Sequence, residues 1–386
     1  MIRRILSLTT KLRYFLNAVW LLLSKFDTKP EKTVIVCMLG HGRALKIAKA
    51  LNHEGVRPSL ITRNSDLEEN TAFDKVLLCT SDWHALYLSI KYYKGSVFHI
   101  LCSWNYTFAS IMIMFNVGRI IIDTFDVLNY FMKPVIKKEY SIQFKLEKWC
   151  MTRAHGLVCR DLRTNLLKKN NWFLPPRILF MDYITSPSSD CRIKKLSRDI
   201  VYLGNVQLDP CNSVAYQYDL SDILCENKIR FDIYPFSKDQ ANELRLKFKN
   251  LYPHVCQSGF LNVYDTILPE QIPNAISSSS YGLLISTKQV NYHDIHSGYN
   301  SVMSRYFFAG KIFDYYESGV FPITQKGMFI SFVMKRMGVG VEVDTYEDIV
   351  TFIDRNENRE VTYNFNVKLT LEHNASRLVA FYDTFR

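Results

Sequence analysis

Short apolar runs alternate with longer amphipathic stretches along the chain from residue 33 onward. Runs that are apolar at every position are typical of strands buried on both faces of a parallel sheet. Amphipathic stretches such as residues 43–55 would supply the covering helices. The first half therefore predicts a Rossmann-like, doubly wound domain, with strands expected at 33–39, 58–62, 75–80, 96–102, 119–124, 156–160 and 177–181.

The second half repeats this pattern. Strands are expected at 199–205, 228–236, 254–260, 281–286, 320–324 and 339–343, with helical stretches at 238–251, 305–319 and 345–356. The polar stretch Ser186–Asp190 predicts a domain boundary. We therefore expect α/β domains at 29–188 and 189–386, with the last helix either in the second domain or packed back on the first. Two such domains predict a ligand cleft between the carboxyl ends of their sheets.

Residues 1–28 form a separate segment. The first 26 residues contain five basic side chains and no acidic one, and most of these cations fall on the helical face opposite Leu8, Leu12 and Leu16. The uninterrupted apolar run, Tyr14–Leu23, is short for a membrane-spanning helix. The segment is therefore expected to be a basic amphipathic helix on an anionic membrane surface. The alternative is an extra helix packed on the first domain.

The amino-acid composition and net charge exclude some classes of protein. Of the 386 residues, 48% are hydrophobic and 22% charged, which excludes a disordered chain. The net charge of +11 favours an anionic partner, but no nucleic-acid-binding module is recognisable, so nucleic acid is not an expected partner. Nine cysteines without a C-x-x-C pair indicate buried free thiols in a reducing, cytoplasmic compartment.

The turn after the first expected strand contains Gly40, His41 and Gly42. Two glycines allow a ligand to approach the backbone closely, and the helix that follows offers free N–H groups to a phosphate. Leu45 occupies the third glycine position of a dinucleotide fingerprint, and Arg63 stands where a ribose-binding acid would be expected. A hydride-transfer enzyme is therefore poorly supported, and a tight turn without a ligand is the other interpretation.

The stretch 310–323 carries the most informative pattern. An amphipathic helix runs toward Gly319, a predicted helix stop, and a short buried strand follows. Lys311 and Asp314 lie three residues apart and share one helical face, where the carboxylate could hold a ribose diol and the ammonium a diphosphate. A solvated ion pair is the alternative.

The preceding loop, residues 291–300, is long and polar. His296, Ser297 and Tyr299 could supply contacts to a sugar or to phosphates, or the loop could be a surface loop without a ligand.

The stretch from Gly310 resembles the K-[IL]-[FY]-[ED]-Y-x-x-x-G-x-P-[VI] element of GT-B glycosyltransferases, especially those similar to glycosyltransferase family 4. Lys311 matches directly, and Asp314 stands where that family usually has Glu. Residues 199–205 resemble the family's entry strand into the second domain, with Gly204 at the close-approach turn. The resemblance extends over about residues 32–360. It implies a nucleotide-sugar site in the second domain and an acceptor site in the first.

The resemblance also bears on metal and cofactor use. No D-x-D motif is present, which fits the metal-independent chemistry that the resemblance implies, so neither a metal nor another cofactor is expected.

The paired glutamates of many retaining members are missing, since Gln325 lies eight residues beyond Glu317.

An inverting transferase needs a base that accepts the proton of the acceptor hydroxyl. Asp123 and Asp126, at the carboxyl end of an expected strand, and His41 are the candidates in the first domain, with Asp126 preferred over Asp123. Turn capping and structural hydrogen bonding are the alternatives for each. His99 lies within an apolar run and is predicted to be a buried core histidine.

These observations predict a cytoplasmic, peripheral membrane glycosyltransferase of the hexosyltransferase type. It would transfer a sugar from a nucleotide-diphosphate sugar to a lipid-linked glycan in surface polysaccharide or lipopolysaccharide biosynthesis. A nucleotide-sugar 2-epimerase and a non-catalytic scaffold of the same fold remain as alternatives. The missing paired glutamates give the scaffold some weight.

Overall fold

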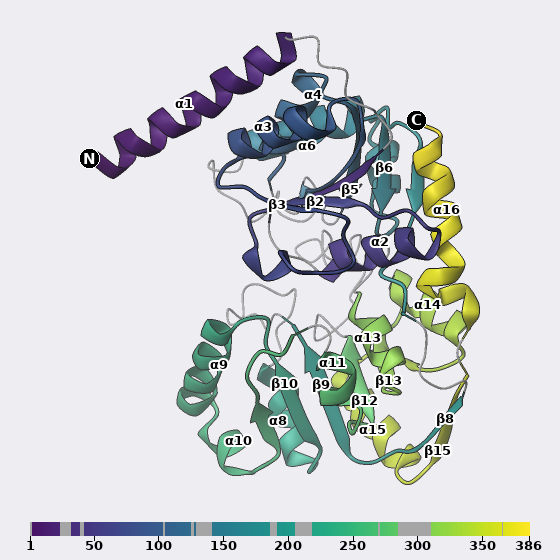
Figure 1. Cartoon of the computed structure of the whole chain (residues 1–386). Helices are drawn as coiled ribbons and strands as arrows, with labels where there is room; N and C mark the ends of the chain where they lie inside the picture. Colours follow the sequence, from purple (N-terminus) through teal and green to yellow (C-terminus); the bar gives the residue numbers. More distant parts are fainter. Residues whose placement is uncertain are drawn as a thin grey trace. The chain divides into compact units, whose positions relative to one another are not determined.

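The computed structural model describes residues 2–23, 32–38, 42–102, 105–124, 127–128, 141–185, 191–204, 218–268, 271–284, 310–364 and 366–386. The chain divides into two compact units, coloured along the sequence in Figure 1. Unit 1 comprises Met1–Asp182 and Leu371–Arg386, and unit 2 comprises Tyr183–Thr370. The division falls at Asp182, a few residues before the boundary expected at 188, and the last helix belongs to unit 1.

Unit 1 is built on a seven-stranded sheet in the order β3-β2-β1-β4-β5-β6-β7, and every neighbouring pair is parallel. All seven strands expected in the first half are present. They are β1 (Thr33–Cys37), β2 (Ser59–Thr62), β3 (Val76–Leu78), β4 (Val97–Cys102), β5 (Arg119–Thr124), β6 (Gly156–Cys159) and β7 (Arg177–Leu179).

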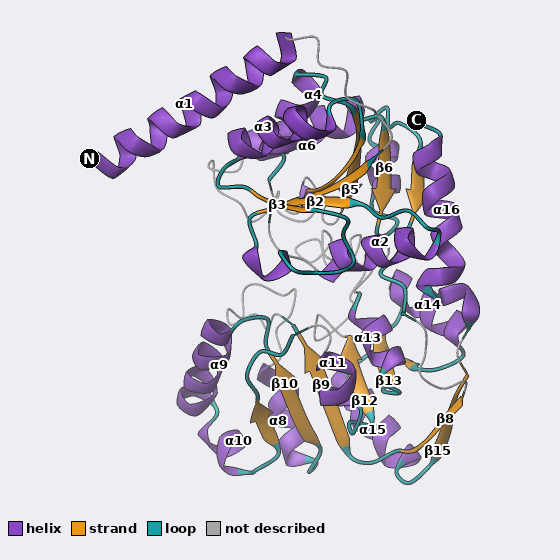
Figure 2. Ribbon diagram, viewed as in Figure 1, coloured by secondary structure: helices purple, strands orange, loops and turns teal. Residues whose placement is uncertain are grey.

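Helices cover both faces of this sheet (Figure 2). The helices of the unit are α2 (Gly42–His53), α3 (Asp82–Tyr93), α4 (Thr107–Met114), α6 (Ser141–Arg153), α7 (Thr164–Lys169) and α16 (Leu371–Asp383), with a 3-10 turn at Ser65–Leu67. Helix α1 (Ile2–Leu23) packs on α3 and not on the sheet. In β1, Val34 and Val36 join the core formed with α3, α4 and α6. Ile35 alternates with them and is also fully buried. Burial on both faces explains why the strand is apolar throughout.

Unit 2 is built on a six-stranded parallel sheet in the order β11-β10-β9-β12-β13-β14. Five of the six strands expected in the second half are confirmed. The strand expected at 254–260 is wrong, because Pro253 starts a short helix, α10 (Pro253–Gln257), and the strand follows it. The strands are β9 (Asp199–Leu203), β10 (Arg230–Tyr234), β11 (Leu261–Val263), β12 (Tyr281–Leu284), β13 (Phe321–Gln325) and β14 (Val341–Val343).

Capping residues mark some of the ends of the other helices of unit 2. A capping box of Thr345 and Asp348 starts α15, and Gly338, with φ of 74°, ends α14. These helices are α8 (Tyr218–Glu226), α9 (Lys238–Leu251), α11 (Ile272–Ile276), α13 (Lys311–Glu317), α14 (Phe329–Met337) and α15 (Tyr346–Asn356), with a 3-10 turn at Val367–Leu369. An unexpected antiparallel pair, β8 (Cys191–Lys195) and β15 (Glu360–Asn364), completes the unit.

The strand order reverses once in each sheet, between β1 and β4 and between β9 and β12. Doubly wound sheets bind ligands at the carboxyl ends of the strands on either side of such a reversal. In unit 2 this position lies just after Leu203, and in unit 1 just after Cys37.

Candidate functional site

Gly204 follows the last residue of β9, at the reversal point of the unit 2 sheet. Its φ is +101°, a conformation that side chains other than glycine rarely adopt, and a Cβ atom built there would meet nothing within 4 Å. Its N–H donates to the Tyr234 carbonyl across to β10 at 2.9 Å. Gly204 therefore lies at an open position of the strand edge, in a backbone conformation that favours glycine.

Replacing Gly204 with alanine is expected to lower the free energy of unfolding by about 1–2 kcal/mol, because the cost arises from the backbone angle and not from a contact. Urea unfolding of the two proteins measures the difference. An alanine variant as stable as the wild type would show that this turn relaxes to a negative φ.

Lys311 is the first residue of α13, and its side chain reaches the same turn. Its Nζ donates to the Leu203 carbonyl at 2.8 Å and lies 3.7 Å from the ring centroid of Tyr202. Burial lowers the pKa of Lys311 to about 7, against the opposing effect of the Asp314 carboxylate. The structure thus brings together two residues that are 107 positions apart in the sequence, Gly204 and Lys311.

The position of α13 is fixed by Tyr315, one turn beyond Lys311. The Tyr315 hydroxyl donates to the Leu283 carbonyl at 3.1 Å and accepts from the Leu203 N–H at 3.2 Å. Its ring packs on Gly282 of β12, where a Cβ atom would lie 2.5 Å from ring carbons. These contacts to β9 and β12 hold Lys311 at the strand edge, and the helix ends before Gly319, whose φ is +66°, as expected.

Two tyrosines extend this edge along the sheet. Tyr234 ends β10 and Tyr264 follows β11, and their rings stack with centroids 4.6 Å apart and planes 8° apart. Tyr264 is 39% exposed. Neither residue was predicted from the sequence. The available signal was an aromatic residue at the carboxyl end of each of two adjacent strands.

The other predicted donor residues are only partly described. Asp314 is half-buried on α13, three residues from Lys311. His296, Ser297 and Tyr299 lie outside the described residues. In unit 1, Gly42 is the first residue of α2, whereas Gly40, His41 and Asp126 also lie outside the described part of the chain.

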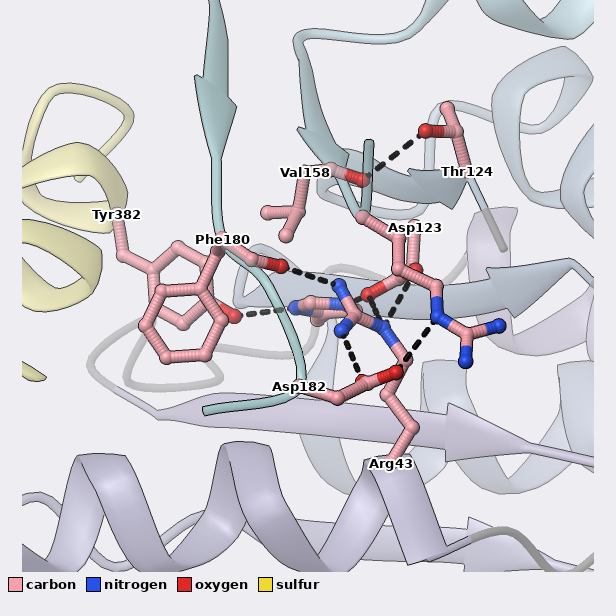
Figure 3. A network of polar contacts seen from close by, with 9 residues as sticks. Arg43, Asp123, Thr124, Val158, Phe180, Asp182 and Tyr382 are labelled. Atoms are coloured by element: carbon pink, nitrogen blue, oxygen red, sulfur yellow. Dashed lines mark hydrogen bonds and ion pairs between the residues drawn. The ribbon is translucent and has the colours of Figure 1, made fainter. Parts of the chain in front are cut away.

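Unit 1 holds a buried polar network at the carboxyl ends of its strands (Figure 3). Arg43, in the first turn of α2, donates through Nε to both Asp123 carboxylate oxygens at 2.8–2.9 Å and through Nη1 to Asp182 at 2.6 Å. Its Nη2 donates to the Phe180 carbonyl at 2.9 Å. One guanidinium therefore links α2 to β5 and to the segment after β7.

Pairing between opposite charges keeps the buried Arg43 and Asp182 side chains ionised. Burial alone would lower the pKa of Arg43, but Asp123 and Asp182 outweigh burial and raise it. Burial alone would raise the pKa of Asp182, but Arg160, at 2.6 Å, and Arg43 hold it well below its usual range. Both groups are therefore ionised near neutral pH.

The network continues to the carboxyl-terminal helix. His99 of β4 is fully buried, as predicted, with Nε2 3.0 Å from Asp123 Oδ2 and Nδ1 hydrogen-bonded to the Tyr382 hydroxyl of α16. Asp123 is fully buried as well. The hydrogen bonds of Asp123 to Arg43 and His99 support a structural role for this carboxylate.

Tyr382→Phe is expected to lower the free energy of unfolding by about 1–3 kcal/mol, because the buried His99 Nδ1 loses its hydrogen-bond partner. Thermal unfolding with far-UV circular dichroism measures this loss. Tyr92→Phe, which changes a half-exposed tyrosine, is the matched control and should have little effect. Equal stability of Tyr382→Phe and the wild type would show that the contact contributes nothing.

In the part of the chain that the structure describes, no group of three or more His, Cys, Asp or Glu side chains could hold a metal ion.

No protein-family model matches the sequence, and no curated protein matches it. Solved structures match it in fold. Sucrose-phosphate synthase from Thermosynechococcus elongatus superimposes with a TM-score of 0.61 at 9% identity, covering 92% of this chain and 98% of that protein. The chain has the GT-B fold.

Other GT-B structures agree over similar lengths. A trehalose-6-phosphate synthase matches with a TM-score of 0.59 at 10% identity, over 92% of this chain and 99% of that protein. Anabaena HepE, solved in complex with UDP and glucose, matches with a TM-score of 0.56 at 12% identity, over 92% and 97%. UDP-GlcNAc 2-epimerase from Methanocaldococcus jannaschii matches less well, with a TM-score of 0.50 at 10% identity, over 92% and 99%.

Proposed function

We propose that this protein is a glycosyltransferase that transfers a hexosyl group from a nucleotide-diphosphate sugar to a glycan acceptor. The observation that carries the proposal is the position of Lys311. It contacts the carbonyl next to Gly204 at the reversal point of a doubly wound sheet, in a chain with the GT-B fold. This is where such a sheet binds a phosphorylated ligand.

The diphosphate, the ribose and the nucleobase of the nucleotide sugar would each contact a different part of this edge. The protonated Lys311 ammonium would stabilise the negative charge that develops on the leaving diphosphate. Asp314 would accept hydrogen bonds from the ribose hydroxyls. The exposed face of Tyr264, supported from behind by Tyr234, offers a flat surface for the nucleobase. His296, Ser297 and Tyr299 would complete the sugar and phosphate contacts of this edge. Gly40 and Gly42 remain candidates for a phosphate contact in unit 1.

Glycosyl transfer requires a base for the acceptor proton as well as a binding site for the nucleotide sugar. The acceptor hydroxyl oxygen bonds to the anomeric carbon, the nucleotide diphosphate leaves with the electron pair of the broken bond, and the hydroxyl proton passes to a base. Asp126 is the first candidate for this base and His41 the second. The proposed reaction is metal-independent and uses no cofactor.

The acceptor is proposed to be a lipid-linked glycan, presented to unit 1 at the cytoplasmic face of a membrane during surface polysaccharide or lipopolysaccharide assembly. The basic amino-terminal segment supports this proposal. Among the described residues, no helix is long and apolar enough to cross a membrane.

Turnover of nucleotide sugars tests the proposed reaction. The full chain is incubated with UDP-, GDP-, ADP- and dTDP-hexoses and a membrane lipid extract, and nucleotide release and glycosylated lipid are followed by mass spectrometry. A transferase releases one nucleotide diphosphate and forms a lipid product heavier by one hexose. Appearance of an epimerised nucleotide sugar, with no lipid product, would contradict the proposal and favour the 2-epimerase. Absence of any turnover would favour the scaffold.

A further inference from the structure

Helix α1 packs on unit 1 through an aromatic face. The Tyr14 ring stacks on His84 of α3 with centroids 4.2 Å apart, and Phe15 meets Trp83 edge-on at 5.1 Å. Ala18 is fully buried in the same interface and belongs to the unit 1 core. These contacts agree with the packed-helix alternative for the segment, and they fix which face of α1 is turned away from the protein.

The outward face of α1 carries an exposed apolar stripe. Leu12, Leu16 and Trp20 are 55%, 55% and 64% exposed. They follow one another at intervals of four residues, so each is displaced only about 40° around the helix from the one before. Arg13 is exposed beside the stripe, about 20° around the helix from Trp20. Large apolar side chains that gather on one exposed face indicate an interaction surface, whereas single ones do not.

A groove between α1 and α3 continues this surface. It has a volume of about 470 Å³ and is lined by Trp20, Leu21, Tyr87 and Ile90, with Lys91 and Lys94 among its walls. Lys94 Nζ donates to the Leu22 carbonyl at 3.2 Å, near the end of α1. Lys91 Nζ lies 4.9 Å from the ring centroid of Tyr92. The groove therefore combines apolar walls with two ammonium groups.

We propose that α1 and α3 form a docking surface for a bilayer containing anionic phospholipid. Leu12, Leu16 and Trp20 enter the boundary between headgroups and acyl chains, and the groove receives the phosphate of one phospholipid beside Lys91 and Lys94. Charge complementarity selects this occupant, because the exposed Arg13 lies beside the stripe and the ammonium groups of Lys91 and Lys94 line the groove. An apolar stripe flanked by cations binds a membrane interface in this way.

This inference deepens the membrane association proposed above and is independent of glycosyl transfer. Helix α1 would serve two purposes with two faces. Tyr14, Phe15 and Ala18 attach it to unit 1, and the stripe attaches unit 1 to the membrane.

Vesicle flotation of the full chain tests the docking surface. The wild type should float with vesicles of phosphatidylcholine and phosphatidylglycerol and should bind pure phosphatidylcholine vesicles about tenfold more weakly. Leu16→Asp should reduce binding to the anionic vesicles at least about tenfold. Lys91→Glu should weaken anionic binding about fivefold and leave neutral binding unchanged.

Leu246→Asp is the matched control, because Leu246 is 60% exposed on α9 of unit 2; it should bind like the wild type. Circular dichroism and nucleotide binding, measured without vesicles, establish that each variant is folded and report separately on the donor site. Three results would overturn the proposal. These are no binding by the wild type, equal binding to neutral and anionic vesicles, or Leu16→Asp binding as tightly as Leu246→Asp.

Discussion

Arg43→Met is expected to lower the free energy of unfolding by about 3–5 kcal/mol, because it leaves the Asp123 and Asp182 carboxylates buried without their shared cation. Chemical denaturation monitored by tryptophan fluorescence measures the change. If the variant does not accumulate as folded protein, Arg43→Lys provides the measurement. It keeps the charge but cannot donate to both carboxylates and the Phe180 carbonyl in the same geometry, so a smaller loss is expected.

Arg245→Met is the matched control for this effect. Arg245 also pairs with an aspartate, Asp265, at 2.7 Å, but both side chains are exposed to solvent. Loss of an exposed pair should change stability by no more than about 1 kcal/mol. If Arg43→Met and Arg245→Met were equally stable, the buried network would contribute nothing specific to unit 1.

The affinity for a nucleotide sugar is expected to fall about tenfold between pH 6 and pH 8, because the pKa of Lys311 is lowered to about 7. Below this pH the side chain is a cation that attracts a diphosphate, and above it the side chain is neutral. A nucleotide sugar is a suitable probe because its diphosphate carries the same charge throughout this range. Titration calorimetry at several pH values measures the effect.

Lys311→Arg is the control for the pH effect, since arginine stays charged and its affinity should not follow the wild-type pH profile. Lys311→Met should bind weakly at every pH. The same pKa also affects stability. Between pH 7 and pH 10.5 the unfolded chain binds more protons at this lysine, so the contribution of Lys311 to the free energy of unfolding rises with pH. A wild-type affinity that does not change with pH would show that Lys311 does not contact the ligand.

Most of the fold could be predicted because strands of a doubly wound sheet are apolar on both faces. This pattern located all the strands of the first sheet and most of the second. It failed at 254–260, where Val255 and Cys256 lie on a short helix that begins at Pro253. It also missed β8, whose sequence CRIKK is mostly polar and which pairs with β15. Such a pair on the surface lacks the apolar pattern of a buried strand.

The candidate site was predictable only where a local motif exists. Lys311 and Gly204 each lie in a recognisable stretch, and the sequence could place Gly204 after a strand and Lys311 near the start of a helix. The packing of Tyr315 on Gly282 and the stacking of Tyr234 on Tyr264 depend on which strands become neighbours. Arg43 follows the predicted glycine turn, but its partner Asp182 is 139 residues away. Nothing local in the sequence specifies such pairings.

We propose that the edge of unit 2 around Lys311 binds a nucleotide-diphosphate donor. Titration calorimetry of the full chain with UDP, GDP, ADP, CMP, dTDP and NAD tests it most directly, with Lys311→Met and the control Lys335→Met, which changes an exposed lysine paired with Glu342. We predict that one nucleoside diphosphate binds the wild type and Lys335→Met alike and that Lys311→Met loses this binding. Binding of NAD alone, or nucleoside diphosphate binding that survives in Lys311→Met, would contradict a donor site at Lys311.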